Sequence, residues 1–244
     1  MAGQGFVHPA RTWPDAAAAW TWARQVFTAA NQIDPLAGGL PELRVVGAYL
    51  VPPPGAVQRS FQALHLDFGL PLGTGQPVDV ARFTALFADP ERGGSGTVTR
   101  IVPLAPLLAQ RSWPERRVIA GRLARTASPD RSVEGILGRI IEIADQGSSL
   151  TPLGTPGFLC GTEFSSLAGE HSYFDRSGVP LEAVQRSVTL GRGELLMLDN
   201  LRTAHGRDGR RNPRELHQLF VGYPSLSQAQ QQVLLDRVLA AFTT

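Results

Sequence analysis

Two histidines and one aspartate, His65, Asp67 and His205, have the types and spacing best suited to chemistry in this chain. Residues two apart in a β-strand share a face, so a strand predicted over 60–69 would point His65 and Asp67 the same way. With a second imidazole from His205, the three groups would occupy one face of an octahedral metal ion and leave the opposite face open. That arrangement suits Fe(II) in oxygen chemistry. Without His205, the pair is equally compatible with a carboxylate that orients an imidazole through a hydrogen bond.

The second histidine belongs to the segment LDNLRTAHGRDGRRNPREL. An apolar strand predicted over 193–198 runs into this polar segment, which places His205 just past the end of the strand. Arg214 follows nine residues after His205, at the start of a further strand predicted over 214–221. His217, three positions after Arg214, would face the other way and is predicted to be structural.

Together these motifs resemble those of the Fe(II)/2-oxoglutarate dioxygenases of the TauD and clavaminate synthase-like superfamily. Members carry a His-x-Asp or His-x-Glu pair, a distant histidine in a DN-x-R-x-x-HGR block, and an arginine on the next strand. The resemblance covers residues 60–221 and is strongest over 193–217. It implies a double-stranded β-helix (jelly roll, cupin-like), iron ligands His65, Asp67 and His205, and 2-oxoglutarate held by Arg214 and Thr99, with Thr97 as the rival threonine.

The chain departs from the family pattern at one position. Related sequences commonly have two arginines four apart on the last strand, whereas this chain has Arg214 and Gln218. If the missing arginine is the essential anchor, 2-oxoglutarate binding is weak or absent unless another arginine substitutes for it. The candidates are Arg202, Arg207, Arg210 and Arg211.

The expected function is an Fe(II)/2-oxoglutarate-dependent oxygenase that hydroxylates, desaturates or cyclises a small, amino-acid-like molecule and releases succinate and CO2. Halogenating relatives have a small residue at the carboxylate position, so Asp67 favours these outcomes over halogenation. The alternative is a jelly-roll metal protein that binds a ligand, or catalyses a non-redox isomerisation, without 2-oxoglutarate turnover. A purely structural interaction domain is the third hypothesis.

The composition excludes several classes of mechanism. All 23 basic residues are arginines, so lysine nucleophiles and Schiff bases are absent. Cys160 is the only cysteine, so neither an intramolecular disulfide nor a thiolate metal cluster can form. The arginines are spread along the chain, which argues against nucleic acid as a partner. We expect a cytoplasmic protein with a small-molecule substrate and O2, because no secretory signal or membrane-spanning run is visible.

The pattern of apolar residues predicts a mainly β fold with helices, as a single domain over 1–244. A helix is predicted over 13–30 and another over 227–242, and a helical insertion over about 104–147. Strands are predicted over 43–51, 60–69, 80–88, 97–102, 158–160, 186–190, 193–198 and 214–221.

Overall fold

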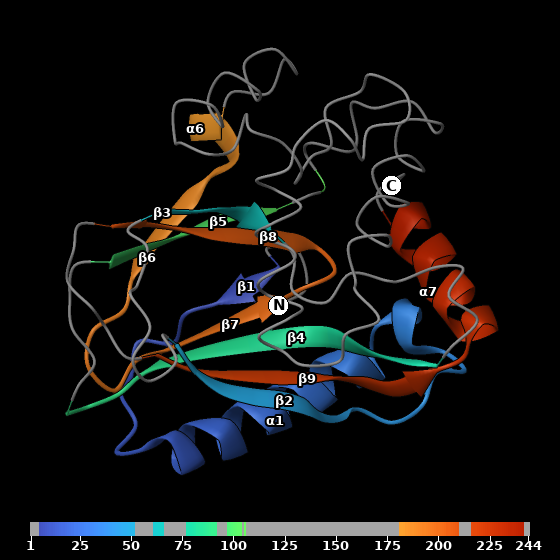
Figure 1. Cartoon of the computed structure of the whole chain (residues 1–244), viewed down its shortest axis with the longest axis horizontal. Helices are drawn as coiled ribbons and strands as arrows, with labels where there is room; N and C mark the ends of the chain where they lie inside the picture. Colours follow the sequence, from blue (N-terminus) through green and yellow to red (C-terminus); the bar gives the residue numbers. More distant parts are fainter. Residues whose placement is uncertain are drawn as a thin grey trace.

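The computed structural model describes residues 5–51, 61–65, 77–91, 97–103, 105, 181–209 and 216–241. Within these ranges the chain forms two antiparallel sheets, one of five strands and one of four, which lie face to face (Figure 1). We call them sheet A and sheet B. The predicted strand over 158–160 and the predicted insertion over 104–147, apart from Ala105, lie outside the described residues.

Sheet A has the order β1 (Phe6–Val7), β7 (Leu195–Asp199), β4 (Val78–Ala88), β9 (Leu216–Leu226), β2 (Arg44–Val51). Sheet B has the order β3 (Phe61–His65), β8 (Thr203–Gly209), β5 (Thr97–Pro103), β6 (Arg186–Thr189). Among the described elements the chain passes repeatedly from one sheet to the other, as in β2 to β3 to β4 to β5 and in β7 to β8 to β9. The described helices are α1 (Ala16–Gln32), η1 (Pro35–Ala37), α6 (Leu181–Val184) and α7 (Gln228–Ala240).

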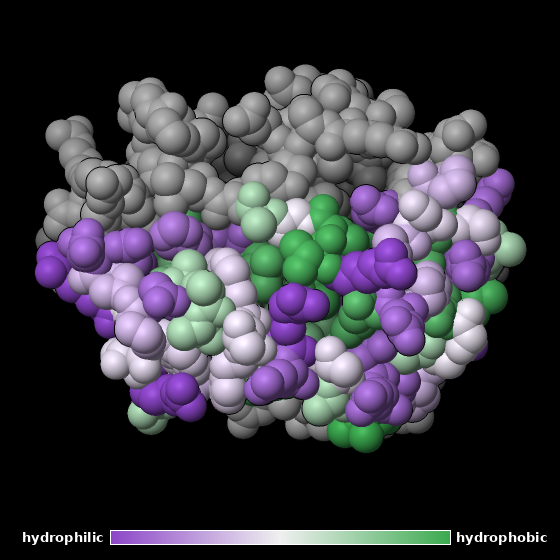
Figure 2. Space-filling model, turned by 90° about the horizontal axis from the view of Figure 1, so that it is seen from below, coloured by the Kyte–Doolittle hydropathy of each residue, from purple (hydrophilic) through white to green (hydrophobic). Residues whose placement is uncertain are grey.

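Helix α1 covers the outer face of sheet A (Figure 1). Asp15 caps its first turn by accepting a hydrogen bond from the amide of Ala18 at 2.8 Å. Phe27 is fully buried and stacks on Phe83 of β4, with ring centroids 4.7 Å apart. Seen from below, this side of the molecule mixes hydrophilic and apolar areas (Figure 2). In the described part of the chain, no helix combines the length and hydropathy that a membrane crossing needs.

A second apolar cluster fills the space between the two sheets. Leu86 of β4 and Leu198 of β7 contribute to it from sheet A, and Ile101 of β5 and Val188 of β6 pack there from sheet B. We call the surfaces that the sheets present to each other their inner faces. The alternate residues of β4 and β7 point the other way and pack against α1, in a separate apolar cluster on the outer face of sheet A. These two strands are buried on both sides, which explains why their sequences are almost continuously apolar.

Most predicted elements are confirmed with small shifts at their ends, but the prediction for His205 was wrong. His205 lies within β8, a strand of its own, rather than just past the end of β7. The segment from Thr203 to Gly209 has two glycines and an aspartate and no alternation of apolar residues, which is typical of a turn. Pairing with β3 on one side and β5 on the other outweighs that local preference.

Candidate metal site

The two histidines singled out by the sequence lie directly opposite each other on neighbouring strands. His205 of β8 is the Cα partner of His65 of β3, and on its other side it is the partner of Ile101 of β5. Residues opposite each other in an antiparallel pair share a face. Because Ile101 packs in the cluster between the sheets, His205 belongs to the inner face of sheet B. His205 is buried, with 5% of its surface exposed.

Thr99 and Arg207 form the next pair along the same face. They are Cα partners, each two residues from a member of the Ile101–His205 pair, and the pairing of β5 with β8 is regular throughout. Thr99 is buried and Arg207 is partly buried. Burial lowers the pKa of the Arg207 guanidinium. Thr97 is the partner of Gly209, one step further from His205 than Thr99.

Sheet A faces these residues with two buried polar side chains among its apolar ones. Gln218 of β9 is the partner of Leu86, and Thr84 of β4 is the partner of Leu198, so both belong to the inner face. Gln218 is 5% exposed and Thr84 fully buried. Gln218, the position at which the sequence resemblance would predict a second arginine, is therefore turned toward the space between the sheets.

His217 lies on the opposite face of β9 from Gln218. Its Nε2 lies 3.2 Å from a carboxylate oxygen of Asp89, and its ring lies 6.1 Å from that of Phe87, which packs under α1. The spacing of His217 had predicted that it would face away from the site. Because the His217 imidazole lies on the other face of the strand, a substitution of His217 can serve as a control for the same substitution of His205.

Part of the predicted ligand set lies outside the described residues. Asp67 would come two positions after the end of β3, and Arg214 two positions before the start of β9. Arg210 and Arg211 also lie outside. Over the described ranges, no three histidine, cysteine, aspartate or glutamate side chains gather closely enough to hold a metal ion. The described backbone does show a register shift in β3 between Gln62 and His65, which interrupts the alternation expected along this strand.

Arg202 is one of the four arginines considered as substitutes for the missing 2-oxoglutarate anchor, but its guanidinium is already paired with two aspartates. Its guanidinium donates to both carboxylate oxygens of Asp34, at 2.5 and 3.0 Å, and to Asp199 at 3.2 Å. Arg82, fully buried, also pairs with Asp34 and Asp199. Burial alone would raise the pKa of Asp34, but the hydrogen bonds from Arg202 and from the amide of Leu36, with the charges of both arginines, hold it below the ordinary value of 3.8.

Sequence reasoning missed two features of this region. The position of Arg207 beside Thr99 follows from simple alternation along HGR, once His205 is known to lie in a strand. The association of Asp34 with Arg82 and Arg202 has no local signal, because 48 and 168 residues separate Asp34 from its partners.

No protein-family model matches the sequence, and a comparison with curated proteins also finds no match. Among solved structures, the chain is similar to the Kdo hydroxylase KdoO, a non-heme Fe(II) alphaketoglutarate dependent dioxygenase, in complex with alphaketoglutarate and Fe(III). The identity is 12% and the TM-score 0.39, over 90% of this chain and 67% of that one. It is also similar to AAD-2 in complex with Mn(II) and N-oxalylglycine, with 15% identity and a TM-score of 0.34, over 67% of this chain and 64% of that one.

A third similar structure is a taurine dioxygenase from Burkholderia xenovorans. Its identity to this chain is 14% and the TM-score is 0.37, over 87% of this chain and 81% of that one. Two of these neighbours are dioxygenases by name, and the third, AAD-2, is a complex with Mn(II). All three TM-scores lie below 0.5, so these similarities assign neither a family nor an activity to this chain.

Proposed function

We propose that the chain is a mononuclear non-haem Fe(II) oxygenase that couples the oxidative decarboxylation of 2-oxoglutarate to the oxidation of a small organic molecule. The observation that carries the proposal is the direct pairing of His65 with His205 across β3 and β8, with His205 buried on the inner face. Directly opposed residues of an antiparallel pair have Cβ atoms about 4.5–5.5 Å apart. Two imidazoles on such a pair can reach a common ion.

The proposed iron ligands are His65, His205 and Asp67. A set of two histidines and one carboxylate fits Fe(II) and leaves positions open for the cosubstrate. The pairing of the two histidines supports this set, and the sequence resemblance assigns Asp67 as its carboxylate. When bound, iron and 2-oxoglutarate would activate O2, the oxidant of both the cosubstrate and the substrate, while the protein supplies binding and orientation.

We propose that Thr99 and Arg214 hold 2-oxoglutarate. Thr99 lies beside His205 on the inner face, which favours it over Thr97. A guanidinium binds a carboxylate through two parallel hydrogen bonds, which is the reason to expect Arg214 at the distal carboxylate. Arg207 is the substitute of choice if Arg214 does not reach the site, since it faces the same space as His205, whereas Arg202 is occupied by Asp34 and Asp199.

The remaining residues would orient the reactants and exclude water. The apolar cluster between the sheets, which includes Leu86, Leu198, Ile101 and Val188, packs beside these polar residues. An apolar wall strengthens the electrostatic contacts made beside it and limits access of solvent. We further propose a single domain with a double-stranded β-helix, a fold supported by the two facing antiparallel sheets and the repeated crossing between them. Hydroxylation, desaturation or cyclisation is the proposed outcome.

Succinate formation tests the proposal. The protein is incubated with Fe(II), ascorbate and 2-oxoglutarate, alone and with a panel of amino acids and related small carboxylates. We expect succinate in the complete mixture, more of it with a substrate, and none with His205→Gln. His217→Gln, which removes an imidazole from the opposite face of sheet A, is the matched control and should retain turnover.

Gln218 favours a second candidate function, a metal protein that binds a carboxylate ligand without oxidising it. An amide on the inner face cannot form the ion pair that an arginine would supply. Under this alternative, metal binds with dependence on His65 and His205, but no succinate forms with any member of the panel. Gln218→Arg would then strengthen 2-oxoglutarate binding.

A further inference from the structure

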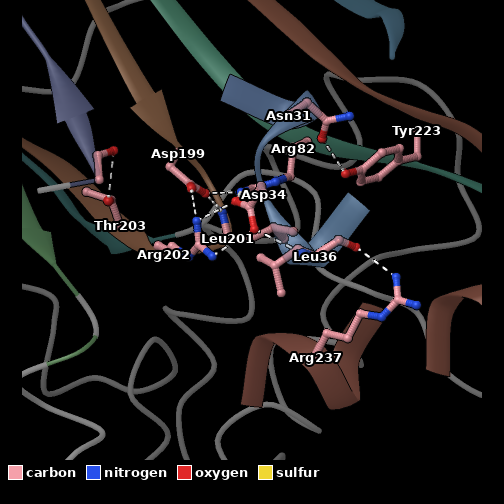
Figure 3. Close-up of polar contacts among 11 residues, drawn as sticks. Asn31, Asp34, Leu36, Arg82, Asp199, Leu201, Arg202, Thr203, Tyr223 and Arg237 are labelled. Atoms are coloured by element: carbon pink, nitrogen blue, oxygen red, sulfur yellow. Dashed lines mark hydrogen bonds and ion pairs between the residues drawn. The ribbon is translucent and has the colours of Figure 1, made fainter. Parts of the chain in front are cut away.

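We infer that a closed ring of ion pairs, formed by Asp34, Arg82, Asp199 and Arg202, positions His205 by fixing the turn from which its strand begins. The inference rests on the proposed function for the role of His205 as a metal ligand. The ring consists of ion pairs among these four side chains (Figure 3).

Each carboxylate of the ring contacts both guanidinium groups. Asp34 lies 2.6 Å from Arg82 and accepts two hydrogen bonds from Arg202, while Asp199 pairs with Arg82 and lies 3.2 Å from Arg202. The four side chains are 8%, 0%, 3% and 30% exposed in the order Asp34, Arg82, Asp199, Arg202. The charges therefore balance within a largely buried group.

The ring holds the turn that joins sheet A to sheet B. Asp199 is the last residue of β7. Its carboxylate accepts a hydrogen bond from the amide of Leu201 at 3.2 Å, and its carbonyl accepts one from the amide of Arg202 at 3.0 Å. Asn200 is tied to β4 twice, through its amide to the carbonyl of Arg82 and through its side chain to the carbonyl of Ala81, both at 3.0 Å. Every residue from Asp199 to Arg202 thus has at least one fixed contact.

The first residue of β8 is fixed as well. The hydroxyl of Thr203 donates to the carbonyl of Gly5 at 3.1 Å, and the same carbonyl accepts the amide of Asp199 at 2.7 Å. His205 comes two residues after Thr203. A shift in the position or direction of this turn would therefore displace the His205 imidazole and change its register with His65.

A buried ring is better suited to defining one geometry than to adding net stability. The desolvation of buried charges offsets much of their attraction, so buried ion pairs are weak evidence for stability. The two-point contact of Arg202 with Asp34, by contrast, is sensitive to direction as well as distance. This contact joins the turn to the segment between α1 and η1, because Asp34 is the N-cap residue of η1.

Arg202→Gln is the test variant, because Arg202 is the least buried member of the ring and its replacement leaves Arg82 paired with both aspartates. Arg237→Gln is the matched control. Arg237 also donates to this part of the chain, to the carbonyls of Leu36 at 3.1 Å and of Gly38, but it comes from α7 and does not touch the turn (Figure 3). Both variants are first compared by circular dichroism and by thermal unfolding.

The first readout needs no metal. The protein has five histidines, and the side-chain NMR signal of His205 is assigned by its loss in His205→Gln. We expect Arg202→Gln to shift the His205 signal and Arg237→Gln to leave it in place. Arg202→Lys keeps the charge but loses the two-point contact, so a smaller shift is expected. It replaces Arg202→Gln in both comparisons if that variant does not fold.

The second readout is the affinity for Co(II), used as an air-stable probe. Groups that orient metal ligands typically change metal affinity by about 10–100-fold, and we expect a loss of about tenfold in Arg202→Gln and no loss in Arg237→Gln. An unshifted His205 signal, or equal effects of the two variants, would overturn the inference. Absence of Co(II) binding in the wild-type protein would contradict the proposed function instead, while the NMR comparison would still decide the role of the ring.

Discussion

His205 and Arg207 are separated by one glycine on β8, and they therefore face the same interior space. Thr99 lies opposite Arg207, and His65 lies opposite His205. Four residues that could take part in chemistry thus occupy adjacent positions on three strands.

The first prediction concerns the two paired histidines. His65→Gln and His205→Gln should each weaken Co(II) binding by at least about 100-fold, beyond the effect of residues that only orient ligands. Isothermal titration or competition with a chelator measures the affinity. His217→Gln should bind as the wild type does, because its imidazole lies against Asp89 and Phe87 on the other face of sheet A. Equal loss in all three variants would point to unfolding rather than to a metal site.

The second prediction concerns Asp34 and pH. Its pKa lies below 3.8 in the folded protein, so its contribution to the free energy of unfolding is fully present above that pH and is lost as the pH falls through the lowered value. Asp34→Asn should cost about 3 kcal/mol at pH 7, because it leaves the buried Arg82 with one partner fewer. The stabilities of the two proteins should converge as the pH falls below 3.8.

Asp15→Asn is the control for this comparison. Its side-chain oxygen still accepts the Ala18 amide, and asparagine caps helices as well as aspartate does. Its stability should follow that of the wild type across the same pH range. A constant difference between the wild type and Asp34→Asn at all pH values would show that the charge of Asp34 is not the cause.

At the scale of elements, the pairing of β4 with β9 forms the centre of sheet A. Gly222 of β9 is placed where a Cβ atom would lie 1.9 Å from the carbonyl oxygen of Val80 and 2.8 Å from the Cα of Ala81. The register of the pairing shifts beside these residues, between Ala81 and Phe83. Only a residue without a Cβ lets the two backbones approach this closely.

Gly222→Ala should therefore destabilise the fold by about 1–3 kcal/mol, as overpacking of a core does. Denaturant unfolding measures the difference. Gly38→Ala is the matched control, since the nearest atom to an added Cβ there is 3.7 Å away and belongs to the flexible side chain of Arg237. A neutral Gly222→Ala would mean that β4 and β9 lie further apart than described.

The strands that the sequence predicts are those whose packing imposes a pattern. β4 and β7 are apolar on both faces because α1 covers one and sheet B the other, and they are recognised from short apolar runs. β8 contains two glycines and several polar residues, so its sequence has the composition of a turn rather than of a strand. The motif singled out His205, but only the pairing with β3 shows what lies opposite it.

At the scale of the whole molecule, the site joins distant parts of the chain. His65 and His205 are 140 residues apart, and the turn before β8 is held by Asp34 from the end of the first helix. A ligand that binds only the folded arrangement of such residues stabilises the entire fold. Metal binding and global stability should therefore be linked.

Thermal unfolding with and without Co(II) tests this linkage. At a free concentration 100 times the dissociation constant, a ligand adds about 2.7 kcal/mol, which corresponds to a rise in Tm of about 5–10 °C for a chain of this length. We expect this rise in the wild type and its absence in His205→Gln. Equal rises in both proteins would indicate that Co(II) binds at a different place.

The most direct test of the central claim is an anaerobic titration with Fe(II) followed by 2-oxoglutarate, monitored in the visible range. A 2-oxoglutarate chelate on ferrous iron has a weak charge-transfer band. We expect this band to appear in the wild type and to saturate at one iron per chain. It should be retained in His217→Gln and absent from His65→Gln and His205→Gln. A folded wild-type protein that shows no band, or a band of full intensity in His205→Gln, would contradict the claim that the paired histidines hold the iron.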